Sequence, residues 1–154
     1  MSRIELARTR FYGVAMRIAE SIDIARSPEQ VWAFVADPTN DPRWCRKVKA
    51  VEPAGPRRWR VLHKPVPLRA GAELVLEHVE FEPPKRLAMR EEDEASVFSV
   101  EYRLAPTTTG TYFTQVSDFE WKKLPRVLRA TFRRGVRRDV RRQLQALKRL
   151  LESV

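Results

Sequence analysis

The sequence predicts an α+β domain in which a seven-stranded antiparallel sheet curls around one long C-terminal helix, with two short helices after the first strand. Three observations predict it. Segments of alternating hydrophobicity recur at hairpin spacing, helix-start residues follow the first of them, and a long amphipathic stretch closes the chain. The 154 residues fit one domain, which we expect to span residues 16–154 after an N-terminal extension at 1–15.

The first strand and the two short helices are predicted from the segment between residues 18 and 44. Ile18–Ala25 alternates as a strand does, and Ser-Pro-Glu-Gln follows at 27–30. Serine caps free amide groups, proline fits the first helical position, and glutamine three residues after the serine completes a capping box. Asp-Pro at 37–38 ends this helix, and Asn-Asp-Pro at 40–42 indicates a second short turn that carries Trp44.

Six further strands are predicted between turn-forming residues. The turns at 53–56, 83–84 and 106–110 are short, which favours antiparallel neighbours, and Lys64–Gly71 is a longer loop. The predicted strands are Val48–Glu52, Trp59–His63, Glu73–Phe81, Leu87–Glu92, Val97–Leu104 and Thr111–Trp121.

The final helix is predicted from about Pro125 to Val154. Gly135 interrupts it at a cost of about 1 kcal/mol relative to alanine, and allows either the close approach of a strand or ligand or a bend. Most arginines lie opposite the broad face that we expect to pack on the sheet, which is formed by Leu128, Phe132, Val136, Val140, Gln143, Leu144, Leu147, Leu150 and Leu151.

The positive charge of the chain is concentrated on this helix. Residues 122–152 hold twelve of the thirty cations and two of the twenty acids, which leaves eighteen cations against eighteen acids elsewhere. Like charges four residues apart cost about 0.2–0.5 kcal/mol per pair, and an anionic partner would relieve this repulsion. The alternative is a solvated face, partly neutralised by acids at 91–94. The predicted anionic-surface residues are Arg133, Arg134, Arg137, Arg138, Arg141 and Arg142.

A family resemblance is carried by the Ile-Ala-Arg-Ser-Pro-Glu-Gln-Val-Trp run at 24–32, with Asp37 and Trp44 downstream. The turn at 83–87, the Tyr-Arg-Leu-Ala-Pro segment at 102–106, Gly-Thr at 110–111 and the terminal helix follow in order. Over roughly residues 16–152 the chain resembles the polyketide cyclase/dehydrase and lipid-transport superfamily, the START-like SRPBCC helix-grip proteins. The resemblance implies a deep cavity between the sheet and the final helix. Its motifs are structural, so they identify the fold better than the function.

The resemblance also implies which residues face the cavity. Gln115 and Ser117 would be polar groups in an apolar wall, each needing a neighbour, a water or a ligand, whereas the opposite phase of their strand would leave them exposed. Either His78 or Glu77 faces inward, but not both without a bulge. The predicted ligand-binding residues are Trp44, Trp59, His63, Met89, Phe98, Tyr102, Gln115, Ser117, Phe132 and Val136.

The predicted function is the sequestration or transport of a small hydrophobic or amphipathic ligand, such as a lipid, a quinone or a polyketide-like molecule, with association to an anionic membrane surface through the arginines. One alternative is a polyketide cyclase/dehydrase-type enzyme, which needs an ionisable pair in the cavity, drawn from His63, His78 and Arg103. Another is a module binding RNA or a ribosome, which is disfavoured because Phe132 is expected to face the core and no other aromatic residue lies among the arginines.

Catalytic, metal-binding and cofactor motifs are not recognisable in the sequence, so no catalytic residue, metal or cofactor is predicted. Cys45 is the single cysteine, which excludes an internal disulfide and favours a reducing compartment. No apolar run reaches the ~20 residues of a membrane span. We expect a cytoplasmic protein that associates peripherally with membranes, and the sequence does not predict an oligomeric state.

Overall fold

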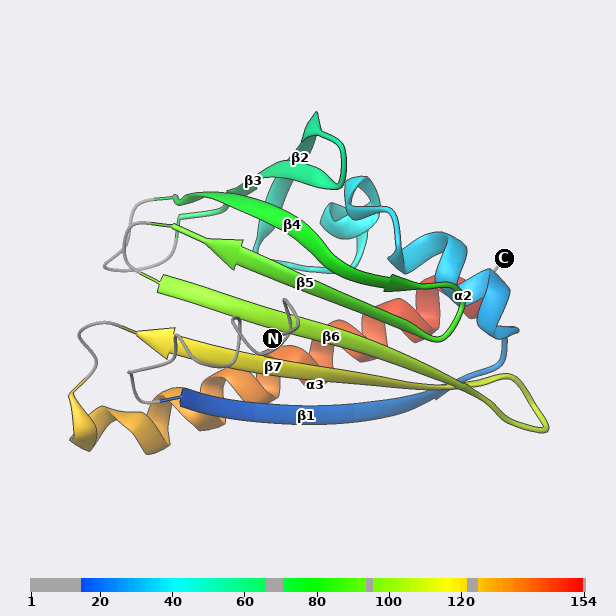
Figure 1. The fold of residues 1–154 in the computed structure, drawn as a ribbon. Coiled ribbons are helices and arrows are strands. Elements are labelled where there is room, and N and C mark those ends of the chain that lie inside the picture. The colour runs from blue at the N-terminus through cyan, green and yellow to red at the C-terminus, as the bar shows by residue number, and fades with distance from the viewer. Residues whose placement is uncertain (1–14, 66–70, 94–95, 122–124, 154) are drawn as a thin grey trace, which may run out of the picture.

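The computed structural model describes residues 15–65, 71–93, 96–121 and 125–153 (Figure 1). Residues 1–14 of the predicted N-terminal extension and most of the predicted loop at 64–71 lie outside the described residues. The division of the chain into an extension and a domain therefore stays a prediction.

A seven-stranded antiparallel sheet forms the body of the molecule, as predicted. The strands follow the order β1-β7-β6-β5-β4-β3-β2, so β1 pairs with the last strand and every other pair is a hairpin. The sheet curls along its length (Figure 1). The strands are β1 (Ala15–Ile24), β2 (Val48–Gly55), β3 (Arg58–His63), β4 (Glu73–Glu82), β5 (Arg86–Glu92), β6 (Ser96–Pro106) and β7 (Thr111–Trp121).

Two short helices connect β1 to β2. The first begins as predicted, whereas the second begins at Pro38, because the Asp-Pro pair that was predicted to end the first helix also caps the second. Helix α2 (Pro28–Val35) has the complete capping box, because the Ser27 hydroxyl accepts from the amide of Gln30 and the Gln30 side chain accepts from the amide of Ser27. The 3-10 helix η1 (Pro38–Arg43) is capped by Asp37, whose carboxylate accepts from the amide of Thr39 at 3.0 Å. These caps fix the path of the chain from the sheet edge to the region around Trp44.

The long helix α3 (Arg129–Glu152) follows a single 3-10 turn, η2 (Arg126–Leu128), and runs along one face of the curled sheet (Figure 1). Val140, Leu144 and Leu147 are buried against the sheet, as the helical period predicts. The chain therefore has the helix-grip architecture that the sequence indicates.

The first part of α3 differs from the prediction. Leu128 and Phe132, expected on the core-facing side, are 43% and 44% exposed. In Figure 1 the N-terminal end of α3 projects past the start of β1. Periodicity identifies the apolar side of a helix, but it does not show where the partner sheet ends. Gly135 serves no close approach, because a Cβ there would meet no described atom within 4 Å.

Candidate functional site

The inner face of the sheet gathers five of the predicted ligand-binding residues. They lie on β5, β6 and β7, and cross-strand register places Tyr102 opposite Gln115. All five are buried, with exposed fractions between 1% and 9%: Met89, Phe98, Tyr102, Gln115 and Ser117. Their burial shows that, of the two phases left open for β7, the inward one is observed for Gln115 and Ser117.

Gln115 and Ser117 are satisfied by neighbouring side chains. The Gln115 amide donates to the Ser117 hydroxyl at 3.1 Å, and the Gln143 amide of α3 donates to the Gln115 carbonyl oxygen at 3.2 Å. These bonds remove the desolvation penalty that unpaired amides would carry in an apolar wall. They join α3 to the sheet through a small polar network inside the core.

The other predicted residues are spread over more of the molecule. The Trp44 ring is buried 5.9 Å from the ring of Tyr102, whereas Trp59 and His63 are half-buried on β3. Val136 packs on the edge of the core from α3. Phe132 lies at the exposed start of that helix, away from the enclosed residues.

A buried group of ionisable side chains next to Trp44 was not predicted from the sequence. Asp41 and Cys45 are 7% and 5% exposed, and the backbone carbonyl of Asp41 accepts from the amides of Trp44 (3.1 Å) and Cys45 (2.7 Å). Glu91 of β5 stands cross-strand from Phe98 in β6. We call Asp41, Trp44, Cys45, Glu91 and Tyr102 the interior polar cluster.

The electrostatics of the interior polar cluster favour neutral forms. Burial raises the pKa of Asp41 well above its usual range, and nearby Glu91 raises it further. Burial also raises the pKa of Glu91, against the opposing charge of Lys47. The thiol of Cys45 and the phenol of Tyr102 have pKa values raised by burial as well. A carboxyl group held neutral in such a site can donate a hydrogen bond as well as accept one.

Trp44 adds a donor to this cluster. Its indole N–H is buried beside Asp41 and forms at most a weak hydrogen bond with that carboxyl group, whose pKa it lowers. A weakly bonded buried donor retains part of the cost of an unpaired one, which is about 1–3 kcal/mol. An acceptor oxygen brought by a ligand would remove that cost.

His78 is the inward-facing member of the predicted His78/Glu77 pair. Its ring is 8% exposed and lies 4.4 Å from Trp59 and 5.9 Å from Phe81. Burial, with a smaller effect of Arg57, lowers the pKa of His78 to about 4, so the imidazole is neutral at pH 7. Glu77 faces the other way and forms an ion pair with Arg58.

Of the residues predicted for the enzyme alternative, Arg103 faces solvent and pairs with Glu101, whereas His63 is half-buried. The side-chain hydrogen bonds of Arg86 and Arg103 outweigh desolvation and lower the pKa of Glu101. Arg103 is thus engaged on the outer surface of the sheet. Within the part of the chain that the structure describes, His78 and the interior polar cluster are the more deeply buried groups for internal acid–base chemistry.

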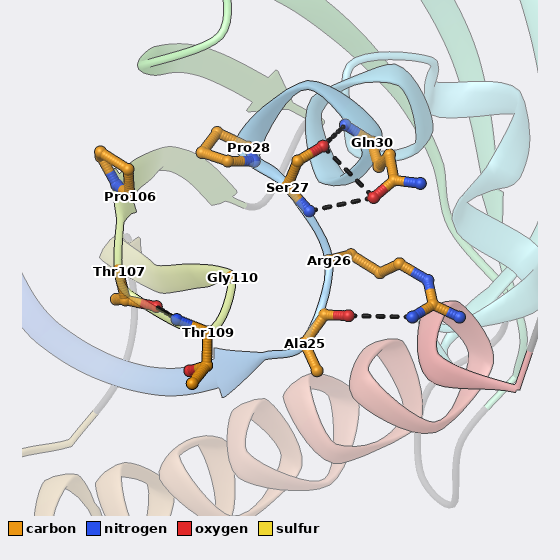
Figure 2. A pocket seen from close by; sticks show the side chains of 9 residues that line it. All are labelled: Ala25, Arg26, Ser27, Pro28, Gln30, Pro106, Thr107, Thr109 and Gly110. Carbon is orange, nitrogen blue, oxygen red and sulfur yellow. Dashed lines mark hydrogen bonds between the residues drawn. The ribbon is translucent and has the colours of Figure 1, made fainter.

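One surface pocket lies where the end of β1, the start of α2 and the β6–β7 hairpin meet (Figure 2). Its polar groups bond to one another: the Arg26 guanidinium donates to the Ala25 carbonyl, and the Thr109 amide donates to the Thr107 hydroxyl. None of the predicted ligand-binding residues lines it. The pocket therefore follows from the way the hairpin packs against the capped helix.

A second surface pocket lies on the outer side of α3, between Arg134, Arg137, Arg138, Arg141, Arg142 and Gln145. Glu20 of β1 forms ion pairs with Arg137 at 3.2 Å and with Arg141 at 3.1 Å. The sequence had suggested the acids at 91–94 for this role. Glu91 instead is half-buried on β5, cross-strand from Phe98, and Glu92 pairs with Arg90.

The comparisons with known proteins agree with this geometry. The family described as "Polyketide cyclase / dehydrase and lipid transport" matches residues 15–152. No curated protein matches the chain. In the described part of the chain, no helix has the length and apolar character needed to cross a membrane.

Three solved structures illustrate the shared fold. A START superfamily protein from Mycobacterium smegmatis aligns with a TM-score of 0.76 and 13% identity, over 89% of this chain and 97% of its own. A protein from Chromobacterium violaceum has a TM-score of 0.71 and 17% identity, with coverages of 88% and 97%. The di-domain ARO/CYC StfQ of the steffimycin biosynthetic pathway has a TM-score of 0.71 and 13% identity, covering 97% of this chain and 54% of that one.

Proposed function

Because the chain belongs to the polyketide cyclase/dehydrase and lipid transport family, we propose that it binds a small hydrophobic or amphipathic ligand between its curled sheet and α3. The observation that supports this proposal is the interior polar cluster, a set of hydrogen-bonding groups in an apolar surrounding, in which burial raises the pKa values of the Asp41 and Glu91 carboxyl groups. Ligand sites in proteins have this composition, with apolar walls and a few convergent polar groups.

The chemistry of the cluster favours a ligand that carries a carbonyl or hydroxyl oxygen. The Trp44 indole offers a buried N–H, and the raised pKa values of Asp41 and Glu91 favour the protonated carboxyl, which can donate a hydrogen bond to an oxygen. Burial of the ligand's apolar part would supply most of the affinity, at about 25 cal/mol per Å² removed from water. Lipids, quinones and polyketide-like molecules all combine these two features.

We place the ligand entrance at the short helices around Trp44 and at the loop near Gly71. Lys47 lies beside this region with its ammonium group 5.5 Å from the centre of the Phe98 ring. It is exposed, and its charge influences Asp41 and Glu91. Lys47 would orient a ligand whose polar end enters last.

The first test is native mass spectrometry of gently purified protein, followed by organic extraction. We expect a stoichiometric small molecule with an apolar body and at least one oxygen. A protein that is empty after expression in several hosts, and that takes up no lipid, quinone or aromatic ketone, contradicts the proposal.

A matched pair of probes tests the role of the polar cluster. 2-Acetylnaphthalene and 2-isopropenylnaphthalene have nearly the same shape but differ in the carbonyl oxygen. We expect the ketone to bind about tenfold more tightly, as one or two net hydrogen bonds would produce. Trp44→Phe should reduce that preference, whereas Glu92→Gln, at an exposed position on β5, should leave it unchanged. If the parent protein binds the ketone and the alkene equally tightly, the interior polar cluster does not take part in ligand recognition.

A second candidate function, a cyclase or dehydrase acting on a bound chain, is favoured by one observation. The interior holds carboxyl groups whose pKa values are raised and an imidazole, His78, that is neutral at pH 7, and an aldol cyclisation needs an acid for the carbonyl oxygen and a base for the adjacent carbon. Turnover of a poly-β-ketone thioester that is lost in His78→Phe would support this function. Stoichiometric binding of the thioester without turnover would contradict the enzyme function and would support ligand transport instead.

We further propose that carriage includes contact with an anionic membrane through the outer arginines of α3. The support is the concentration of charge. Arg133, Arg134, Arg138 and Arg142 are exposed on one helix, whose middle holds the single acid Asp139, and Glu20 of β1 pairs with Arg137 and Arg141 beside them. Each cation near an anionic bilayer contributes about 1 kcal/mol. Binding to phosphatidylglycerol vesicles that weakens as salt is raised would support it, and equal binding to neutral vesicles would contradict it.

A further inference from the structure

Exposed apolar side chains are concentrated where α3 begins. Val127 is 87% exposed, the most exposed of the large hydrophobic residues described, and Leu128 and Phe132 are 43% and 44% exposed. Two of the three occupy η2 and the third lies within the first turns of α3. We call residues 126–134 the helix tip.

Arginines surround these apolar side chains. The tip contains Arg126, Arg129, Arg133 and Arg134, and the first acid after it is Asp139. Neither η2 nor α3 has a side-chain cap at its start, and neither has an acid in its first turn. Cations at a helix N-terminus oppose the macrodipole, so this end of the helix is unfavourably charged in water.

One arginine of the tip is also incompletely paired. The Nε atom of Arg129 is buried and makes no hydrogen bond with the residues that the structure describes. Exposed aliphatic groups, adverse charge and an unused donor thus coincide in nine residues. Each of them destabilises the free protein, and one anionic, apolar partner would relieve all three.

We propose that the helix tip inserts into the surface of an anionic phospholipid bilayer, with Val127 and Leu128 at the acyl boundary and the tip arginines on headgroup phosphates. This proposal rests on the proposed function, in which membrane contact serves ligand transfer. It assigns that contact to the N-terminal end of α3. Shallow insertion of this kind combines apolar burial with attraction to anionic lipid.

A bilayer fits the tip better than the other possible partners. RNA is bound through aromatic stacking and phosphate contacts, in which exposed valine and leucine side chains gain little. A second copy of the chain would bring the same arginines against each other in a symmetric contact. A bilayer offers hydrocarbon and phosphate within a few ångströms of each other. These two chemistries match the apolar side chains and the arginines of the tip.

The experiment compares sedimentation with vesicles of phosphatidylcholine alone and of equal parts phosphatidylcholine and phosphatidylglycerol. The tip variant is Val127→Asn/Leu128→Asn, which keeps every charge. The matched control is Val75→Asn/Val79→Asn, because these valines of β4 are also exposed, at 44% and 55%. We expect the tip variant to bind anionic vesicles at least tenfold more weakly, and the control to stay within about twofold of the parent protein. Thermal unfolding verifies that both variants fold.

Insertion depth gives a second readout. Leu128→Trp fluorescence should be quenched by brominated acyl chains in anionic vesicles, while Val79→Trp should not be, relative to the parent protein with its four tryptophans. Undiminished binding by the tip variant, together with loss of binding in Arg133→Gln/Arg134→Gln, would show adsorption by charge and overturn insertion. RNA binding tighter than vesicle binding, or dimerisation abolished by the tip variant, would also overturn it. The tip is remote from the interior polar cluster. A tip variant that no longer binds vesicles but still co-purifies with ligand would therefore leave the proposed ligand binding unaffected.

Discussion

At the scale of single residues, the closest backbone approach described for a glycine is at Gly110, where β7 begins beside the end of β1. Its φ angle is +155°, and a Cβ there would lie 2.1 Å from the carbonyl oxygen of Ile24 and 2.8 Å from the amide nitrogen of Arg26. Both atoms belong to the backbone, which cannot move aside as a flexible side chain can. The site therefore requires glycine for its conformation and for its lack of a side chain.

Gly110→Ala should destabilise the protein by more than about 2 kcal/mol, because strain in the backbone adds to the clash. Gly135→Ala is the control, since that position is helical and open, and it should gain about 0.5–1 kcal/mol. Urea denaturation of both variants measures the difference. A gain of stability in Gly110→Ala would show that the two strands separate more easily than the structure indicates.

Glu91 shows what the sequence could have revealed about the site. It is in phase with Leu87 and Met89, which were both predicted to face the core, and the strand period of two carries it to the same side. Its position in an acidic run suggested a surface residue. Asp41 offered no comparable signal, because a turn punctuated by prolines has no period, and its burial arises only when η1 packs onto the sheet.

At the scale of elements, Glu20 links α3 to the edge of the sheet. Its side chain is 15% exposed and pairs with Arg137 and Arg141, one helical turn apart on α3. One carboxylate thus neutralises two members of a like-charged ladder. This pairing holds the middle of the helix against β1, in the same segment where Val140 and Leu144 are buried.

Glu20→Gln should lower the free energy of unfolding by about 1 kcal/mol, because both arginines would lose their partner in a partly desolvated position. Glu52→Gln, which breaks an exposed ion pair with Arg60, should change it by less than about 0.5 kcal/mol. Chemical denaturation at low and high salt measures both. Equal effects of the two substitutions would mean that Glu20 acts as an ordinary surface charge.

The order and type of the elements could be predicted because each carries a local signal. The capping box at Ser27, the alternation along β7 and the helical period of α3 are all confirmed. The exposure of Leu128 and Phe132 could not be predicted, since it depends on where the sheet stops covering the helix. The pairing of Glu20 with α3 likewise depends on the register between elements distant in sequence.

At the scale of the whole molecule, two sets of ionisable groups make stability depend on pH in opposite directions. The pKa of His78 is lowered from 6.5 to about 4, so protonation favours the unfolded chain and stability falls as pH decreases below 6.5. Asp41 and Glu91 have raised pKa values, so ionisation favours the unfolded chain and their stabilisation is lost as pH rises through those values. The loss of stability at low pH thus comes from His78, and the loss at high pH comes from Asp41 and Glu91, in a different part of the molecule.

His78→Phe should remove most of the decrease in unfolding free energy that the parent protein shows between pH 7.5 and pH 5. Between pH 7.5 and pH 5 the parent protein should lose about 2 kcal/mol of stability through His78, and the variant should lose much less. Glu101 and Glu152, whose pKa values are lowered, add to acid sensitivity only below their usual range near 4.5. Guanidinium denaturation at pH 7.5, 6 and 5 separates these contributions. Identical slopes for the variant and the parent protein would mean that His78 is hydrated in the native state.

Glu91→Gln should act in the opposite direction, because the amide keeps the shape of the side chain and cannot ionise. Relative to the parent protein, the variant should be more stable at pH 8, and its advantage should shrink as the pH falls below 4.5, where the parent carboxyl group becomes neutral in both states. Glu92→Gln on the exposed side of β5 should differ from the parent protein by less than about 0.5 kcal/mol at either pH. If Glu91→Gln is destabilised at pH 8, the buried carboxylate must gain more from Lys47 than it loses by desolvation. The cluster would then hold a carboxylate paired with the exposed Lys47, and its ligand would be a polar molecule rather than a neutral ketone or quinone.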